Sequence, residues 1–258
     1  MQSLWLKTYW SEKVIKPEKD AYGQELLAFL QGEEVYEIIE REDHFIDASP
    51  HGPAVYFSEF PDWPQIEQEA IQYAHGRVLD VGCGAGRVCL YLQEKGLEIL
   101  GIDNSPLALE VCKQRGVNNV SLTPLSQVSS RLGIFDTIVM FGNNFGLFES
   151  HAKAKHRLRK FARLTSPEGC ILAESSDIYL TTDQDHLAYQ ASNRQKGRMS
   201  GQIRLRVRHR KSIGSWFDYL MVSKGEMEEI VAGTGWEVGR FIDSAESPLY
   251  IAILEKVP

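Results

Sequence analysis

The chain has 258 residues, of which 43% are hydrophobic and 24% charged, and its formal net charge is −7. This composition is typical of a globular protein with a sizeable core, and it argues against fibrous, disordered and dedicated nucleic-acid-binding classes. Because no apolar run approaches the ~20 residues that cross a bilayer, and the N-terminus lacks a secretory pattern, we expect a cytoplasmic protein without a membrane partner.

Residues 1–66 are expected to form a cap segment that contains helices and an aromatic loop. The pattern predicts helices over Ala21–Leu30 and Val35–Arg41, followed by a loop in "SPHGPAVYFSEFPDWP". The rings in this loop could wall an acceptor pocket, or they could fasten the segment to the core, which we favour. They are Tyr56, Phe57, Phe60 and Trp63.

Residues 67–258 show strands and helices in alternation, which favours a parallel sheet with helices on both faces. The expected strands are 77–82, 98–103, 119–122, 135–142 and 169–175, and the expected helices are 67–74, 87–94, 105–116, 151–164 and 224–232. Two last segments, 236–243 and 248–256, can form a closing hairpin. Residues 176–223 interrupt the alternation and are expected to be an insertion.

The stretch "RVLDVGCGAGR", residues 77–87, carries a strand into a glycine-rich loop and a helix. Open α/β sheets bind ligands at such loops, because free N–H groups and the helix dipole converge there. A dinucleotide loop has the spacing G-x-G-x-x-G, whereas Gly82, Gly84 and Gly86 give G-x-G-x-G. Arg87 stands where the third glycine would be, which argues against a pyrophosphate ligand and a nicotinamide oxidoreductase.

"VLDVGCGAGR" followed by "GIDNSPLAL" resembles the class I S-adenosylmethionine-dependent methyltransferases. The resemblance implies an α/β fold with a seven-stranded, mostly parallel sheet, helices on both faces and a C-terminal antiparallel hairpin. It also implies a methyltransferase with S-adenosyl-L-methionine as cofactor. The cap segment and a β-hairpin insertion would be added to this core.

The same resemblance implies a set of cofactor-binding residues. Asp103 would accept the two ribose hydroxyls, with Asn104 beside it, since a carboxylate offers two acceptor oxygens. Many members carry an Asp for adenine after the third strand; here the stretch is "TPLSQV", so Leu125 or Ser126 would serve instead. The residues near the methionine part and the donor methyl would be Asp80, Gly82, Cys83, Gly84, Gly86, Phe141, Gly142 and Asn143.

Methyl transfer needs mainly alignment, which can supply ~7–11 kcal/mol of the barrier, so no catalytic residue is named. His44, His51 and His151 are weak candidates for a general base. The cysteines show no metal-ligand spacing, and no metal site is expected. These reduced core thiols are Cys83, Cys89, Cys112 and Cys170.

The insertion contains "GQIRLRVRHRKSIGSWFDYLMVS", an alternating pattern that predicts a hairpin with its turn at Ser212–Gly214 and one arginine-rich face. These arginines could bind an anionic substrate or RNA. They could equally pair with the acidic segment 33–47 of the same chain or of a second subunit, which we favour. They are Arg204, Arg206, Arg208 and Arg210.

We therefore expect a methyltransferase for a small-molecule acceptor. Two alternatives stay open: an RNA or nucleotide methyltransferase that uses the arginine face, and a non-catalytic module that binds S-adenosylmethionine. The sequence also leaves a homodimer open. Candidate acceptor-binding residues are Tyr56, Phe57, Trp63, Asn144 and Arg206.

Overall fold

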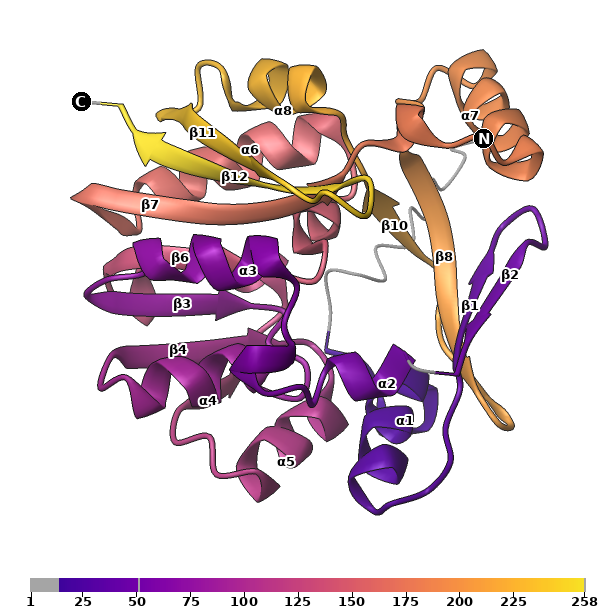
Figure 1. Cartoon of the computed structure of the whole chain (residues 1–258), viewed down its shortest axis with the longest axis horizontal. Coiled ribbons are helices and arrows are strands. Elements are labelled where there is room, and N and C mark those ends of the chain that lie inside the picture. The colour runs from indigo at the N-terminus through magenta and orange to yellow at the C-terminus, as the bar shows by residue number, and fades with distance from the viewer. Residues whose placement is uncertain (1–13, 51, 258) are drawn as a thin grey trace, which may run out of the picture.

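The computed structural model describes residues 14–50 and 52–257, and its centre is a seven-stranded sheet (Figure 1). Five neighbouring strands run parallel, and β11 and β12 form an antiparallel hairpin at one edge, which confirms the predicted fold class. In spatial order the strands are β11 (Trp236–Asp243), β12 (Leu249–Lys256), β7 (Thr165–Ser176), β6 (Phe135–Met140), β3 (Arg77–Val81), β4 (Glu98–Asp103) and β5 (Val120–Leu122).

Helices cover both faces of this sheet, as its strands require, because they are apolar on both sides. Val78 packs toward one layer and its neighbour Leu79 toward the other. The first layer holds α3 (Gln65–Ala70), α4 (Arg87–Glu94) and α5 (Pro106–Gln114), and the second holds α6 (His151–Ala162) and α8 (Lys224–Val231).

A second, antiparallel sheet stands at the carboxyl ends of the parallel strands (Figure 1). We call it the cover sheet. Its strands run in the order β10-β8-β1-β2, with the short β9 paired to β8. They are β1 (Glu37–Arg41), β2 (Ile46–Ser49), β8 (Gln202–His209), β9 (Ser212–Ile213) and β10 (Phe217–Leu220).

The cover sheet corrects two predictions. The helix predicted over Val35–Arg41 is wrong, because this segment pairs with β8 as strand β1. The predicted hairpin is present, but its turn is Arg210–Lys211, since Ser212 and Ile213 already pair back onto β8.

Three further helices complete the described chain: α1 (Ala21–Leu30), α2 (Gly52–Val55) and α7 (Gln184–Gln195). Asp20 joins α1 to the sheet, because its carboxylate caps α1 at Gly23 N (2.9 Å) and also accepts from Ser105 Oγ (2.7 Å), at the N-cap of α5. None of the helices in the described ranges is long and apolar enough to span a membrane.

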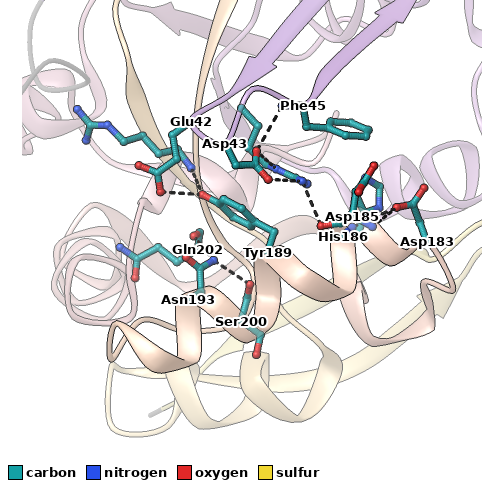
Figure 2. A network of polar contacts seen from close by, with 12 residues as sticks. Glu42, Asp43, Phe45, Asp183, Asp185, His186, Tyr189, Asn193, Ser200 and Gln202 are labelled. Carbon is teal, nitrogen blue, oxygen red and sulfur yellow. Dashed lines mark hydrogen bonds and ion pairs between the residues drawn. The ribbon is translucent and has the colours of Figure 1, made fainter.

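The insertion is more helical than expected, because it includes α7, and a polar network ties this helix to the cover sheet. Figure 2 shows the Tyr189 hydroxyl donating to Glu42 in the turn after β1, at 3.0 Å. Asn193 donates to the carbonyls of Ser200 and Gln202 at 3.1 and 2.7 Å. Two parts of the predictions lie outside the described residues. They are residues 1–13 of the cap segment, on which the expectation about a secretory signal rests, and His51.

Candidate functional site

A cavity of about 550 Å³ lies between the carboxyl ends of the parallel strands and the cover sheet. This volume is within the range of small-molecule sites, roughly 300–1,000 Å³. One end is lined by the loops after β3, β4 and β6, and the other by the cover sheet and α1. The lining therefore joins the two regions that the sequence assigned to a cofactor and to an acceptor.

The glycine loop after β3 adopts a backbone that favours glycine at every second position. Gly82, Gly84 and Gly86 have φ angles of +72°, +51° and +81°, in the left-handed region. A Cβ on Gly86 would lie 2.7 Å from Val117 Cγ2, so this residue lets α4 pack closely. Gly82 and Gly84 line the cavity, whereas Gly86, predicted to contact the cofactor, does not.

Asp103 connects the glycine loop to the end of β4. Its two carboxylate oxygens accept hydrogen bonds from Gly84 N at 3.1 Å and Ser105 N at 2.9 Å. Burial raises the pKa of Asp103 to about 6. A carboxylate has about four acceptor positions, so Asp103 keeps acceptor capacity beyond these backbone N–H groups.

Asp80 also lines the cavity and is 3% exposed. Its carboxylate accepts a hydrogen bond from Cys89 Sγ at 3.3 Å, and burial raises its pKa to about 7. The predicted residues Cys83 and Asn104 line the cavity as well. Of the two adenine candidates, Leu125 lines it and Ser126 does not.

The loop after β6 is fastened to the glycine loop. Asn144 Nδ2 donates to the carbonyls of Val81 and Gly82, at 2.9 and 3.1 Å. Asn143 has a left-handed φ of 63°, and its buried Oδ1 has no hydrogen-bond partner among the described residues. Phe141, Gly142, Asn143 and Asn144 all line the cavity, so Asn143 offers an acceptor to a ligand there.

Arg87 explains why a large residue follows the third glycine of the loop. Its guanidinium forms two hydrogen bonds to the Glu67 carboxylate, at 2.5 and 2.6 Å, and stacks on Trp63 at 4.7 Å. Both charged side chains are buried, with exposed fractions of 9% and 2%. The pair anchors the start of α4 to α3.

The aromatic loop contributes less to the cavity than its composition suggests. Trp63, predicted to bind the acceptor, is 3% exposed, belongs to the core around α3 and α4 and does not line the cavity. Phe57 packs against Phe29 and Arg115, away from the cavity lining. Of the proposed wall, Tyr56 alone lines the cavity, and Phe57 and Trp63 fasten the segment to the core.

The arginine-rich face of β8 points away from the cavity, which Ile203, Leu205 and Val207 line instead. Arg206, predicted to bind the acceptor, instead pairs with Glu40 at 2.7 Å. These contacts hold the pKa of Glu40 down at about 2. The arginines thus pair within the chain: Arg206 and Arg208 with Glu40, Arg210 with Glu33, and Arg204 with Asp218.

Three further lining residues under the cover sheet were not predicted from the sequence, because they come from three separate segments. Tyr22 comes from α1, Glu37 from β1, and Tyr219 from β10. Each is an aromatic or acidic residue on the side of its helix or strand that faces the cavity. That side can be recognised only once it is known which strands pair with each other. Neither His44 nor His151 lines the cavity.

Comparisons with known proteins agree with this arrangement. A family model for a methyltransferase domain matches residues 78–169. The chain is 38% identical over 80 residues to the 2-heptyl-1-hydroxyquinolin-4(1H)-one methyltransferase of Mycobacteroides abscessus, a match that covers 29% of this chain and 34% of that protein. It is 29% identical over 101 residues to the putative methyltransferase YqeM of Bacillus subtilis, covering 38% and 41%. The chain thus spans less than half the length of these curated relatives.

A solved structure resembles nearly the whole chain. It is a methyltransferase from Bacteroides fragilis in complex with S-adenosyl-L-homocysteine, with a TM-score of 0.81 and 29% identity, and the match covers 95% of this chain and 98% of that one. The likeness therefore includes segments outside the matched methyltransferase domain. On its glycine motif, its strand order and these matches, the chain contains a methyltransferase domain of the class I S-adenosylmethionine-dependent type, whose cofactor is S-adenosyl-L-methionine.

Proposed function

We propose that this protein transfers a methyl group from S-adenosyl-L-methionine to a small-molecule acceptor bound beneath the cover sheet. The observation that carries this proposal is the single cavity of about 550 Å³ shared by the glycine loop and the cover sheet. A cofactor at one end and an acceptor at the other would meet inside it. When bound, the cofactor supplies an electrophilic methyl group.

The cavity residues suit the cofactor chemically. Asp103 lines the cavity and keeps acceptor capacity beyond its backbone donors, which suits the two neighbouring hydroxyls of a ribose. Asn143 Oδ1 is a buried acceptor that lacks a donor among the described residues, and an ammonium group would satisfy it. Gly82 and Gly84 bring the backbone against the ligand without side chains between.

The protein's contribution to the reaction would be alignment and exclusion of water. The inner face of the cover sheet presents apolar side chains, so an acceptor would sit in a largely dry site beside the loop after β6. Holding two reactants in line can lower the barrier by about 7–11 kcal/mol.

The pairing of the arginine face favours a small acceptor over RNA. Each of these side chains already has a carboxylate partner within the chain, so the face offers fewer unpaired charges to phosphates. The relative from M. abscessus carries a small molecule in its name, which supports the same class for this chain.

Release of S-adenosyl-L-homocysteine from the wild-type protein, with pools of small acceptors and with RNA, tests the proposal. We expect turnover with a small-molecule pool that falls at least about tenfold in Asp103→Ala, because hydrogen bonds to a charged group contribute about 1.5–3 kcal/mol. Asp62→Ala, at an exposed position, is the matched control and should leave turnover unchanged. Turnover with RNA alone, or cofactor binding with no turnover on any acceptor, would overturn it.

A further inference from the structure

The acceptor end of the cavity contains carboxyl groups that have no basic partner among the described residues. Glu37 Oε1 accepts a hydrogen bond from the Tyr56 hydroxyl at 2.6 Å, and the acid Asp47, which also lines the cavity, acts on Glu37 electrostatically. Burial raises the pKa of Glu37 above its ordinary value. Glu37 therefore stands in a negative environment inside the cavity.

A second buried carboxyl group, Glu25, comes from α1. It is 0% exposed, and neither of its carboxyl oxygens has a hydrogen-bond partner among the described residues. It lies three positions after Tyr22 on α1, so the two side chains are neighbours on one helix face, and Tyr22 lines the cavity while Glu25 does not. Glu25 interacts electrostatically with Glu37, Tyr22 and Tyr56. Burial raises its pKa to about 9, so Glu25 is protonated at neutral pH and adds no charge to the cavity.

The basic residues of the lining do not offset these acids. Arg41 is bonded to Asp43 through two contacts of 2.8 Å, and Arg87 is bonded to Glu67. Of the other two basic residues of the lining, Lys19 lies on the exposed surface, and the His186 ring packs against Phe45 at 5.0 Å. An anionic acceptor would therefore meet carboxyl groups rather than an available arginine.

Aromatic rings surround the same part of the cavity. Tyr22 and Tyr56 meet edge to face with ring centres 5.4 Å apart, and Phe217 and Tyr219 do so at 6.4 Å. Ring faces attract cations, and the attraction is larger where water is excluded. The lining rings in this part are Tyr22, Phe45, Tyr56, Trp216, Phe217 and Tyr219.

These groups are connected to the cofactor end through direct contacts. The Tyr22 hydroxyl lies 2.7 Å from where a Cβ of Gly84 would stand, Tyr22 packs on Tyr56, and Tyr56 bonds to Glu37. We propose, building on the proposed function, that the methyl acceptor is a small primary or secondary amine that enters as a cation and is held by Glu37 among these rings.

The chemistry of this step balances without a further reactant. The bound ammonium first gives one proton to the Glu37 carboxylate and becomes a neutral amine. Its nitrogen lone pair then forms the N–C bond while the C–S bond of the sulfonium breaks, and that electron pair stays on sulfur. The methylated ammonium leaves, and Glu37 returns its proton to water. Glu37 would act both as the site for the cation and as the proton acceptor.

The test uses calorimetric titration of the full-length protein saturated with S-adenosyl-L-homocysteine. The probes are phenethylamine, cyclohexylmethylamine and butylamine, each matched by the neutral alcohol with the same skeleton. We expect at least one amine to bind about tenfold or more tightly than its alcohol, the size expected for a charge-assisted hydrogen bond. If every alcohol binds as tightly as its amine, or no amine binds, the inference is overturned.

Variants locate the preference and separate it from the proposed function. Glu37→Gln should remove the amine preference, and Glu34→Gln, exposed and three positions away, should leave it intact. If Glu37→Gln does not fold, Tyr56→Phe is used instead. This variant removes a hydroxyl but keeps the Glu37 carboxylate, so it should keep the amine preference, and loss of the preference would contradict the inference. Failure of S-adenosyl-L-homocysteine to bind refutes the proposed function, whereas its binding without any amine preference refutes the amine inference alone.

Discussion

Substitution of Glu25 by glutamine is predicted to stabilise the protein. The Glu25 carboxyl is fully buried and has no hydrogen-bond partner among the described residues. Burial and the charge of Glu37 raise the pKa of Glu25 from 4.5 to about 9. The folded protein therefore holds a proton at neutral pH that the unfolded chain releases. Its stability decreases as pH rises through this window, because the folded state binds more protons.

The size of the effect follows from this difference in pKa. Each pH unit above 4.5 costs the folded state about 1.4 kcal/mol, which gives about 3 kcal/mol at neutral pH. Glutamine has a similar shape and does not ionise, so Glu25→Gln should recover most of this free energy. For a chain of this length the expected rise in Tm is about 6–12 °C.

Thermal unfolding at several pH values measures this effect. Glu25→Gln should melt above the wild type at pH 7 and together with it near pH 4.5, whereas the exposed control Glu34→Gln should match the wild type throughout. A variant that melts at or below the wild type at pH 7, or whose gain does not depend on pH, would refute the reasoning. A gain in stability would also show that Glu25 lowers the free energy of unfolding of the wild type, as functional groups often do.

Three further predictions concern the anchors of the site. Glu67→Gln and Arg87→Met should each cost about 3–5 kcal/mol in urea unfolding, and the double variant should cost clearly less than their sum; additive losses would show that the buried pair does not act as a unit. Asn144→Ala, which frees two carbonyls of the glycine loop, should weaken S-adenosyl-L-homocysteine binding about threefold to tenfold by calorimetry, and an unchanged affinity would contradict that role. Because its arginine partners lower the pKa of Glu40 from 4.5 to about 2, stabilisation by Glu40 should be complete above pH 4.5 and be lost as pH falls to about 2. In urea unfolding, Glu40→Gln should be less stable than the wild type at pH 7 and converge with it in acid; a constant difference would contradict the assignment.

The cofactor end was predictable because its signals are local in the sequence. The strand, the alternating glycines and the following helix lie within residues 77–94, and Asp103 ends the next strand. Even here the contacts of one residue were missed. The spacing predicted a glycine backbone at Gly86, but its close packing against Val117 depends on a residue 31 positions later in the chain.

The acceptor end was not predictable because its elements are held by distant pairing. The segment Glu37–Arg41 has a helical composition, yet it is a strand since β8 pairs with it, and Glu40 meets Arg206 across 166 positions. The charge pattern alone did predict that the arginines would pair with the acidic segment. It did not predict which side chains would face the cavity: Tyr22 and Glu37 line it, and Arg206 does not.

Titration calorimetry with S-adenosyl-L-homocysteine tests the central claim most directly, that this cavity is the cofactor site of the protein. We predict one binding site on the wild-type chain, an affinity that falls at least about tenfold in Asp103→Ala, and no binding of NAD. Binding that is absent from the wild type, or equal in wild type and Asp103→Ala, would contradict the account.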